Sequence, residues 1–503
     1  MNDPVHIQLL PLGKTLAVQP GASLQDVLFA QGVEFPCGGR GRCKGCRVKV
    51  LAGDVEVSAE DCALLPADEL AAGWRLSCRA RARGDLTLEL AQWEATILAD
   101  DTAFAFTPQE GLGVAVDLGT TTVVAQLLDR RTGHVLAVRT ALNAQGRHGA
   151  DIMSRIDFAS HEDGQTTLVR LIRKQIGHLI EELLSTAHGR EHELSEVVIV
   201  GNTVMHHLFC DVTVEPLSRH PFEPADGGLR IFSTEELGWR TASAATVRFL
   251  PCLGSFVGSD ILAGVLATRL HESEALVALV DLGTNGEMVV GNRDRLLCAS
   301  TAAGPAFEGA RISMGMRAAT GAISEVNVSD GEVRCRVLGN VEPRGICGSG
   351  LVDAIAAGLE IGRIQPSGRM SGAEGFPLAP PVSITQADVR ELQLAKGAIA
   401  AGLRILVQQW GARLEDVSRL YLAGAFGNYI NRASARRIGL IELPPEKVVP
   451  AGNTALLGAK LALFSLHDHD GSHAAIRRRI QHVPLNEDPL FQEIYVEAMG
   501  FPG

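Results

Sequence analysis

The sequence predicts a multi-domain α/β protein, and three observations support this fold class. The chain has 503 residues, and at a scale of ~150 residues per domain this length suggests about three domains. The stretch FPCGGRGRCKGC (35–46) concentrates three cysteines and four glycines in a chain with only ten cysteines. Farther along, an apolar segment followed by Asp-Leu-Gly-Thr occurs twice. We therefore expect a small N-terminal domain followed by a larger, duplicated α/β unit.

Composition limits the functional classes. Hydrophobic residues make up 46% of the chain and charged residues 21%, which is typical of a globular protein with large cores. The net charge of −12 disfavours nucleic acid as a partner, because nucleic-acid-binding proteins usually carry a basic surface. No apolar run approaches the ~18 residues of a membrane helix, and the start MNDPVHIQLL lacks the basic segment of a signal peptide. Six singly scattered cysteines suit a reducing compartment, so we expect a cytoplasmic protein without a membrane partner.

Residues 1–92 are predicted to form the first domain, with a linker over 93–111. A short helix is predicted at SLQDVLFAQG (23–32), with Ser23 as its N-cap and Gly32 at its end. Four strands and this helix would make a small mixed sheet. The predicted strands are VHIQLL (5–10), KTLAVQP (14–20), CRVKVLAG (46–53) and DLTLEL (85–90).

Four cysteines of this domain have the spacing of iron–sulfur ligands: Cys37, Cys43, Cys46 and Cys78. Plant-type [2Fe–2S] ferredoxins use C-x4-C-x2-C with a distant fourth cysteine, and the first gap here is one residue longer, as in the adrenodoxin-like branch. The glycines between the ligands let the loop wrap tightly and aim N–H groups at sulfur. A structural zinc site is the alternative, but such sites usually show two C-x2-C pairs. We therefore predict a [2Fe–2S] cluster, and we predict that Cys62 is a buried thiol outside the ligand set.

The rest of the chain contains an internal repeat. Asp-Leu-Gly-Thr lies between apolar strands in GVAVDLGTTTVVAQLLD (113–129) and in VALVDLGTNGEMVVGN (277–292). A later strand in each half ends in glycine, in EVVIVGNTVMHHLF (196–209) and RLYLAGAFGNYI (419–430). We divide this region into halves at 112–275 and 276–503, facing each other across a cleft. The arrangement resembles the actin, sugar-kinase and heat-shock chaperone superfamily, which has a duplicated ribonuclease H-like fold and binds ATP in that cleft.

The resemblance implies roles for individual residues. Asp117 and Asp281 would orient water around Mg²⁺. Phosphate contacts would come from Gly119, Thr120, Thr121 and Thr122 in the first half and from Gly283, Thr284 and Asn285 in the second. The loop LAGAFGN would admit the nucleoside beside Gly424, Ala425 and Gly427. Asp151 either positions the attacking water or caps a helix. The alternative is a duplicated α/β domain that has lost its nucleotide, although no GxxxxGK[ST] stretch offers a rival phosphate site.

Three other features are open to two interpretations. RGICGSGLVDAI (344–355) is either an anion-binding glycine nest or a packed turn. STAAGPAFEGA (300–310) is either cleft lining or a loop between a strand and a helix. His206 and His207 are expected to lie in an apolar helix after GNTVM, and we predict packed histidines there rather than metal ligands.

Taken together, the cysteine loop and the ATP cleft resemble the reductive activators of corrinoid-dependent enzymes. In that family an N-terminal [2Fe–2S] domain, here expected to be a β-grasp ferredoxin fold, precedes an actin-like ATPase. The resemblance implies ATP-dependent return of an inactive Co(II) corrinoid to Co(I) in a methyltransferase system. It implies a corrinoid protein or corrinoid methyltransferase as partner and an upstream reductase or ferredoxin as electron donor, and it leaves a homodimer open. Two alternatives are an ATP-dependent electron donor to another metalloenzyme, and a ferredoxin fused to a non-catalytic, ATP-switched binding or assembly module.

Overall fold

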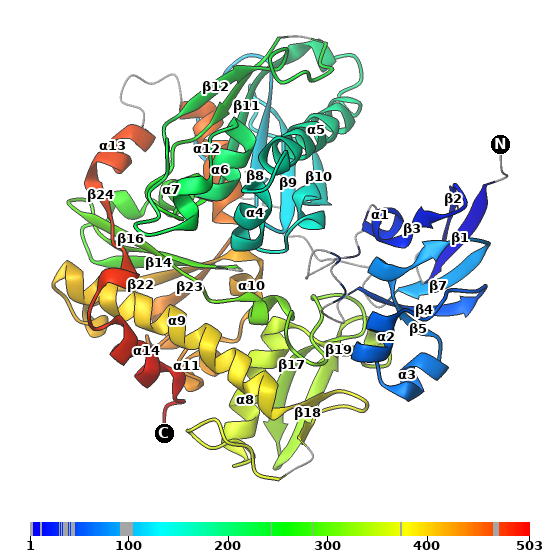
Figure 1. Ribbon diagram of the computed structural model, residues 1–503. Coiled ribbons are helices and arrows are strands. Elements are labelled where there is room, and N and C mark those ends of the chain that lie inside the picture. Colours follow the sequence, from blue (N-terminus) through cyan, green and yellow to red (C-terminus); the bar gives the residue numbers. More distant parts are fainter. Residues whose placement is uncertain are drawn as a thin grey trace.

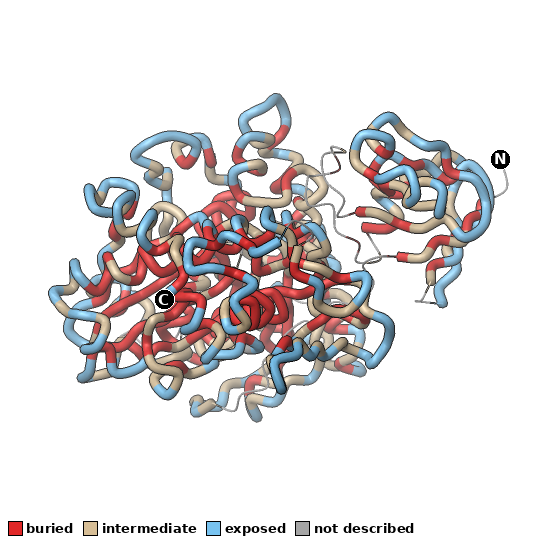
Figure 2. Tube along the Cα trace, turned by 90° about the horizontal axis from the view of Figure 1, so that it is seen from below, coloured by how far each residue is buried: buried red, intermediate tan, exposed pale blue. Residues whose placement is uncertain are grey.

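The structure is a computed structural model, which describes residues 4–10, 13–29, 31, 33, 39, 41, 46–90, 104–242, 244–283, 285–372, 375–465 and 472–503. Figure 1 shows a small N-terminal domain beside a larger body that consists of two α/β halves. Each of these three parts has its own hydrophobic core. In Figure 2 the buried backbone is concentrated in the centre of the larger body, and a smaller buried centre lies within the N-terminal domain.

The N-terminal domain is built on a five-stranded mixed sheet with the order β2-β1-β7-β4-β5. Strands β1 and β7 run parallel, and the other neighbours are antiparallel. Both β1 and β7 alternate between buried and more exposed side chains, as expected for a sheet with one face on the core. The strands are β1 (Val5–Leu10), β2 (Lys14–Val18), β4 (Arg47–Ala52), β5 (Trp74–Leu76) and β7 (Leu86–Leu90).

Part of this domain was not predicted from the sequence. Strand β5 and the helices α2 (Ala59–Leu64) and α3 (Ala67–Ala71) were not predicted. Ser58 and Asp61 form a reciprocal capping box at the start of α2, a pattern that the sequence carries and that could have revealed the helix. Helix α1 covers only Leu24–Phe29, and Ser23 belongs to a short strand, β3 (Ala22–Ser23), that pairs with β6 (Arg81–Ala82).

The first half is built on a six-stranded sheet with the order β10-β9-β8-β11-β13-β12. Helices cover both faces, so the central strand β8 is buried almost throughout. Val114 and Val116 pack into the core formed with α5 and α6, while Ala115 faces the opposite core formed with α7 and α12. The strands are β8 (Leu112–Leu118), β9 (Thr122–Asp129), β10 (Val135–Leu142), β11 (Leu194–Gly201), β12 (Arg230–Ser233) and β13 (Thr246–Phe249). The helices are α4 (Ile152–Ala159), α5 (Gly164–Leu184), α6 (Thr203–Cys210) and α7 (Ser259–Thr268).

The second half has a six-stranded sheet with the order β23-β22-β14-β15-β16-β24. Its strands are β14 (Val277–Leu282), β15 (Gly286–Gly291), β16 (Leu296–Thr301), β22 (Arg419–Ala423), β23 (Val448–Gly452) and β24 (Ile480–His482). Its helices are α8 (Gly348–Glu360), α9 (Gln386–Trp410), α10 (Gly424–Tyr429), α11 (Arg432–Arg437), α12 (Thr454–Ser465), α13 (Ser472–Arg479) and α14 (Phe491–Met499). Between β16 and α8 the chain forms a three-stranded sheet of β17 (Ala322–Ser329), β18 (Glu332–Val337) and β19 (Gly345–Ile346). A small hairpin of β20 (Phe376–Pro377) and β21 (Ser383–Ile384) precedes α9.

The two large sheets share one topology. We number the strands of each half along the chain and leave out β12 and β24. Both sheets then have the strand order 3-2-1-4-5, if the second sheet is read starting from the β16 side. In both, the second strand is antiparallel to its two neighbours, and the fourth and fifth are parallel to the first. A helix follows the fourth strand in each half, α6 and α10, and another follows the fifth, α7 and α12. The predicted duplication is therefore confirmed.

Helices α7 and α12 join the two halves through a backbone-to-backbone contact. A Cβ atom added to Gly458 would lie 2.1 Å from the carbonyl oxygen of Ala263. Gly264 approaches the Thr454 hydroxyl in the same way, since its added Cβ would lie 3.2 Å from that oxygen. Small residues at these positions let the helices pack closely enough to hold the halves together.

Among the described helices, none combines the length and the apolar composition that a membrane crossing requires.

Candidate functional site

Each Asp-Leu-Gly-Thr turn lies against a glycine at the end of the fourth strand of its own half: Gly201 is the last residue of β11, and Gly424 directly follows β22 and begins α10. A Cβ atom added to Gly201 would lie 2.6 Å from the carbonyl oxygen of Leu118, and one added to Gly424 would lie 2.7 Å from that of Leu282. Leu118 and Leu282 directly follow the two predicted catalytic aspartates. A side chain at either glycine would displace the neighbouring turn, so the two halves build the cleft from matching parts.

The first predicted phosphate loop, residues 119–122, is held in place by hydrogen bonds from Asn143 and Arg155. The Asn143 side chain donates from Nδ2 to the carbonyl of Gly119 at 2.9 Å, and its backbone N–H donates to the carbonyl of Thr121 at 2.8 Å. The Arg155 guanidinium donates to the carbonyl of Thr120 between them. Because three successive carbonyl groups are engaged by these donors, the loop presents less negative charge to a phosphate.

The other contacts of this loop come from α6 and β9. The Thr120 hydroxyl accepts a hydrogen bond from Asn202 Nδ2 at 2.8 Å, and the Asn202 side chain in turn caps α6 by accepting from the Met205 N–H. The Gly119 N–H donates to the carbonyl of Thr122, the first residue of β9, at 3.0 Å. Asn143, Asn202 and Arg155 were not predicted from the sequence as site residues.

The second phosphate loop has a similar turn. The Gly283 N–H donates to the carbonyl of Asn285 at 3.1 Å, while Thr284 lies outside the described residues. The Asn285 side chain forms a hydrogen bond with Glu287, which partly offsets the effect of burial on that carboxyl group and its pKa. The expected contact of Asn285 with a terminal phosphate remains a prediction.

Three stretches that the sequence analysis singled out converge beside the second half of the cleft. Phe307, from residues 300–310, stacks on Phe426 of α10 with a centroid separation of 4.7 Å and an interplanar angle of 20°. Gly348 begins α8, and a Cβ atom there would lie 1.9 Å from the Phe307 carbonyl oxygen. Gly424 has a φ of +85°, and a Cβ atom at Gly427 would lie 3.1 Å from Leu422. The predicted nucleoside loop, which includes Ala425, therefore packs against the start of α8.

Four carboxyl groups influence one another where the halves meet, and of these Glu287 is buried while the three aspartates are partly buried. Burial raises the pKa of Asp117 to about 6, although Asn453 Nδ2 donates to its carboxylate at 2.9 Å and opposes this effect. Burial and then the charge of Asp117 raise the pKa of Asp281 to about 7. Burial raises the pKa of Asp260 to about 8, with a further contribution from the charges of Asp281 and Asp117. Burial and the charges of Asp260 and Asp281 raise the pKa of Glu287 well above its usual range.

This acidic cluster, defined as Asp117, Asp260, Asp281 and Glu287, fits a hydrated divalent cation. Among the described residues, no basic side chain is one of the main influences on the pKa values of these four carboxyl groups. Within the described ranges, no three acidic, histidine or cysteine side chains lie close enough together to hold a metal ion directly. The donor chemistry of the acidic cluster, which consists of carboxylate oxygens alone, is of the kind that Mg²⁺ binds together with water ligands.

Sequence reasoning missed two members of this cluster, although the chain carries a signal for each. Glu287 is an acidic residue in an otherwise apolar, fully buried strand, GEMVVG. Asp260 lies in the first turn of an apolar helix, SDILAGVLAT. A charge in such a place has a high cost unless it has a partner, and that cost marks both residues as functional candidates.

Asp151 is the N-cap of α4. Its carboxylate accepts a hydrogen bond from the Ser154 N–H at 2.8 Å, and the Ser154 hydroxyl lies 3.2 Å from the Asp151 N–H in return. The capping role is thus one of the two that the sequence allowed, and positioning of the attacking water remains a prediction.

His206 and His207 are fully buried in α6. Burial and the neighbouring His207 lower the pKa of His206 to about 4, which agrees with packed, neutral histidines.

The structure describes two of the four predicted cluster ligands. Cys46 precedes β4 and Cys78 follows β5, and both are buried. The two segments are joined because the Ser77 N–H and hydroxyl donate to the Cys46 carbonyl at 3.1 and 2.7 Å. Cys37 and Cys43 lie outside the described residues. A pair of buried thiols on adjacent segments suits an iron–sulfur cluster.

Three further residues of the cysteine loop and its surroundings are informative. Gly39 and Gly41 have φ values of +76° and +66°, a conformation that favours glycine. The prediction that Cys62 is a buried thiol is wrong, because Cys62 lies exposed on α2. Because α2 was not predicted from the sequence, its solvent-exposed face could not be assigned.

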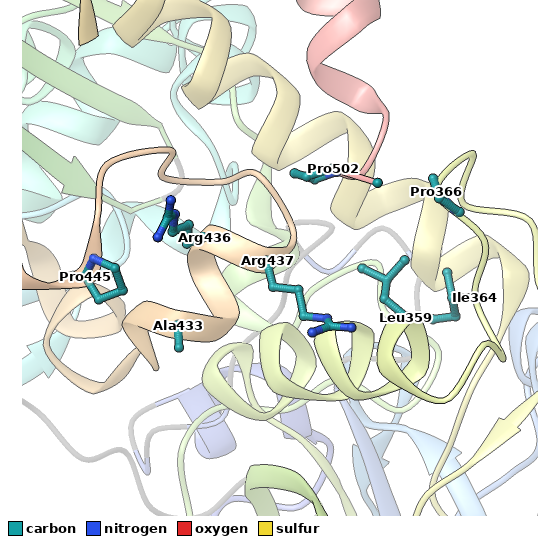
Figure 3. Close-up of a pocket in the computed structure, with 9 residues that line it drawn as sticks. Leu359, Ile364, Pro366, Ala433, Arg436, Arg437, Pro445 and Pro502 are labelled. Carbon is teal, nitrogen blue, oxygen red and sulfur yellow. The ribbon is translucent and has the colours of Figure 1, made fainter. Parts of the chain in front are cut away.

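A cavity of about 500 Å³ lies elsewhere on the second half, where α8, α11 and the C-terminal residues meet (Figure 3). Arg437 extends over α8 in this view, and its guanidinium lies 3.9 Å from the Glu360 carboxylate. None of the described phosphate-loop residues lines this cavity. It is therefore separate from the acidic cluster.

Comparisons with known proteins assign the chain to a family. Three family models match: a 2Fe-2S iron-sulfur cluster binding domain at residues 7–83, the RACo middle region at 112–273, and the C-terminal domain of RACo, the ASKHA domain, at 275–503. The chain is 36% identical over 417 residues to the corrinoid activation enzyme RamQ of Eubacterium limosum, covering 76% of this chain and 69% of the relative. The chain belongs to the family of corrinoid activation enzymes.

Two more distant members agree with this assignment. The chain is 29% identical over 425 residues, or 77% of each protein, to the [Co(II) methylated amine-specific corrinoid protein] reductase of Methanosarcina barkeri. A solved structure named reductive activator for corrinoid, iron-sulfur protein superposes with a TM-score of 0.70 at 28% identity, covering 99% of this chain and 98% of the other. The predicted fold class and the family resemblance are thus confirmed.

The first prediction concerns the cluster. We expect Cys78→Ser to remove the visible absorbance of the purified protein, because a thiolate ligand is lost. Cys62→Ser is the matched control and should keep the full spectrum, since Cys62 is exposed on α2. Iron and sulfide analysis of the wild type should give two of each per chain. Zinc in place of iron, or four irons per chain, would contradict the assignment.

The second prediction concerns the cleft. We expect Asp117→Asn and Asp281→Asn each to slow ATP hydrolysis by about 100-fold or more, because each removes a charge placed to act on a metal–phosphate unit. Both variants should keep the visible spectrum of the cluster, which lies in a different domain. Asp157→Asn, an exposed carboxylate on α4, is the control. Full ATPase activity in either cleft variant would show that the phosphate loops are wrongly assigned.

The third prediction concerns pH. In the folded protein, Asp260 and Glu287 keep protons that the unfolded chain releases near pH 4. Without divalent cations, stability should therefore fall as the pH rises from about 5 to about 8, by up to about 1.4 kcal/mol per pH unit for each retained proton. Thermal melting should show a shallower decline in Glu287→Gln, and Mg²⁺ with ATP should reduce the decline in the wild type. An increase in melting temperature over this range would refute the idea.

Proposed function

We propose that this protein is an ATP-dependent reductive activator that returns the Co(II) corrinoid of a methyltransferase system to Co(I). The observation that carries the proposal is the union, in one chain, of a [2Fe–2S] binding domain with an ATP-type cleft, in a family whose members are named for corrinoid activation. A cluster bound by the four cysteines supplies one electron at a time. The proposed acceptor is the cobalt of a separate corrinoid protein.

The energetics explain why ATP accompanies a one-electron reductant. Plant-type clusters have potentials near −400 mV, and the Co(II) corrinoid is still harder to reduce. Each 59 mV of uphill transfer costs a factor of ten in the equilibrium for one electron. A cleft that binds ATP with different affinities in two conformations can favour the complex in which cobalt is easier to reduce.

The chain's own residues support this use of ATP. Asn143 and Arg155 hold the first phosphate loop in place, and Asn453 connects Asp117 to the start of α12 across the cleft. We propose that the acidic cluster holds the water shell of Mg²⁺, which neutralises both the carboxylates and the phosphates of ATP. An upstream reductase or ferredoxin as electron donor, and a homodimer, remain predictions.

The fourth prediction tests the reaction itself. A purified Co(II) corrinoid protein is mixed anaerobically with this protein and a chemical reductant, with or without ATP. We expect the Co(II) electron paramagnetic resonance signal to disappear at least ten times faster when both ATP and the protein are present. Asp117→Asn should abolish the effect of ATP while its cluster still accepts an electron.

The outcome separates the alternatives. An equal rate with and without ATP would exclude ATP-coupled activation. Reduction of a different metalloenzyme under the same conditions, with the corrinoid unchanged, would favour a general ATP-dependent electron donor. ATP binding with no electron transfer to any acceptor would favour a non-catalytic, ATP-switched module.

A further inference from the structure

The N-terminal domain contacts the first half of the ATPase body through Arg147. The Arg147 guanidinium lies 3.3 Å from the Asp26 carboxylate and 5.0 Å from the centre of the Phe29 ring. Asp26 and Phe29 both belong to α1, which leads into the cysteine loop. Leu142, at the end of β10, packs against the core of the N-terminal domain. An ion pair, a cation–π contact and an apolar contact therefore make up this junction.

A second contact comes from the other half. The Arg344 guanidinium lies 3.2 Å from the Glu89 carboxylate of β7. Arg344 immediately precedes β19 and α8, and the start of α8 packs against the predicted nucleoside loop. In Figure 1 the N-terminal domain accordingly lies alongside both halves, close to β19.

These two contacts join three rigid parts. Leu28 of α1 and Leu88 of β7 are fully buried in the same hydrophobic core, so the distance between Asp26 and Glu89 is fixed within the N-terminal domain. Arg147 and Arg344, in contrast, belong to different halves. Rotation of one half against the other changes the separation of the two arginines. Both ion pairs can therefore form in only one relative orientation of the halves.

The first contact is also connected to the phosphate loop. Asn143 and Arg155 hold the carbonyls of that loop, and Arg147 lies between them in the sequence. Arg155 is itself fully buried and anchors this segment by donating from Nε to the Gly149 carbonyl at 2.9 Å and from Nη1 to Gln145 Oε1 at 3.3 Å. A shift of the phosphate loop therefore moves the segment that carries Arg147.

We propose that Arg147 and Arg344 form a nucleotide-sensitive latch that docks the N-terminal domain across both halves, so that one nucleotide state holds the domain and the other releases it. The latch rests on the proposed function only in taking ATP as the ligand of the cleft. Hinge closure around a ligand is the common response of two-lobed proteins. A change of the angle between the halves breaks at least one of the two pairs and frees the N-terminal domain to approach a partner.

The strength of the contacts suits a reversible latch. The side chains of both ion pairs are partly exposed, from 29% for Glu89 to 61% for Asp26. Ion pairs of this kind are weak and are screened by salt. A modest difference in nucleotide affinity between two conformations is therefore enough to shift the docked population.

The latch can be tested by a distance measurement on the full-length holoprotein. One nitroxide label is placed on Cys62, which is exposed on the N-terminal domain, and the other on Glu162→Cys, an exposed position of the first half. A Cys335→Ser background removes a half-buried thiol. Double electron–electron resonance is then recorded with and without a non-hydrolysable ATP analogue, after titration has established that the analogue binds.

We expect a narrow distance distribution in one nucleotide state and a broad one in the other. Arg147→Ala and Arg344→Ala should each give the broad distribution in both states. Arg139→Ala, which removes a surface arginine paired with Glu182 in the first half, should behave like the wild type. The reciprocal exchange Arg344→Glu with Glu89→Arg should restore the narrow distribution that Arg344→Ala loses.

Two outcomes would overturn the latch: a wild-type distribution that does not respond to the nucleotide, or single arginine variants that respond as the wild type does. Corrinoid reduction is measured separately on the same samples. A nucleotide-dependent distance without corrinoid reduction would support the latch and contradict the proposed function alone. Corrinoid reduction without a distance response would support the proposed function and contradict the latch.

Discussion

Helices α7 and α12 touch backbone to backbone where Gly458 lies against Ala263, and the geometry of the cleft depends on this contact. Each helix follows the fifth strand of its own half, β13 or β23, so their contact sets the angle at which the two sheets face each other. It also places Asn453, just before α12, within hydrogen-bonding distance of Asp117 in the opposite half. A change in that angle therefore acts directly on Asp117, one of the two predicted catalytic carboxylates.

The acidic cluster is the chemical result of this arrangement. Carboxyl groups that would be unremarkable in solvent become buried close to one another, and their pKa values rise because each charge lacks water and faces another charge. Under the proposed function, Mg²⁺ bound with ATP would supply the positive charge that this cluster lacks. Binding would then favour the relative orientation of the halves that brings the carboxylates and the cation together, and this would give ATP a means of selecting that orientation.

The position of the N-terminal domain, which is the predicted carrier of the electron, also depends on how the two halves are oriented. Its ion pairs reach one arginine in each half, so the placement of the domain depends on the angle between the halves and not on one half alone. Electron transfer requires the cluster to approach its acceptor, and the energy of ATP is used at the cleft. The cleft and the docking of the N-terminal domain both depend on the angle between the halves. This angle therefore connects two sites that are separated in the sequence and in space.

The sequence by itself determined the local chemistry of this protein. Cysteine spacing and the repeated Asp-Leu-Gly-Thr turns are recognisable because a cluster and a phosphate each need particular residue types at fixed short intervals. The strands around Asp117 and Asp281 followed from apolar runs between these turns. These features predicted the fold class, the duplication and the family.

Only the tertiary structure decided which distant residues meet. Asp260 and Glu287 are single acids in apolar segments, and their high pKa values arise from burial and from neighbours in other elements. The pairing of Arg147 with Asp26 likewise joins two domains that no local pattern relates. The exposure of Cys62 depends on which face of α2 packs on the sheet. Such contacts form between segments far apart in the chain, so periodicity and spacing within one segment carry no information about them.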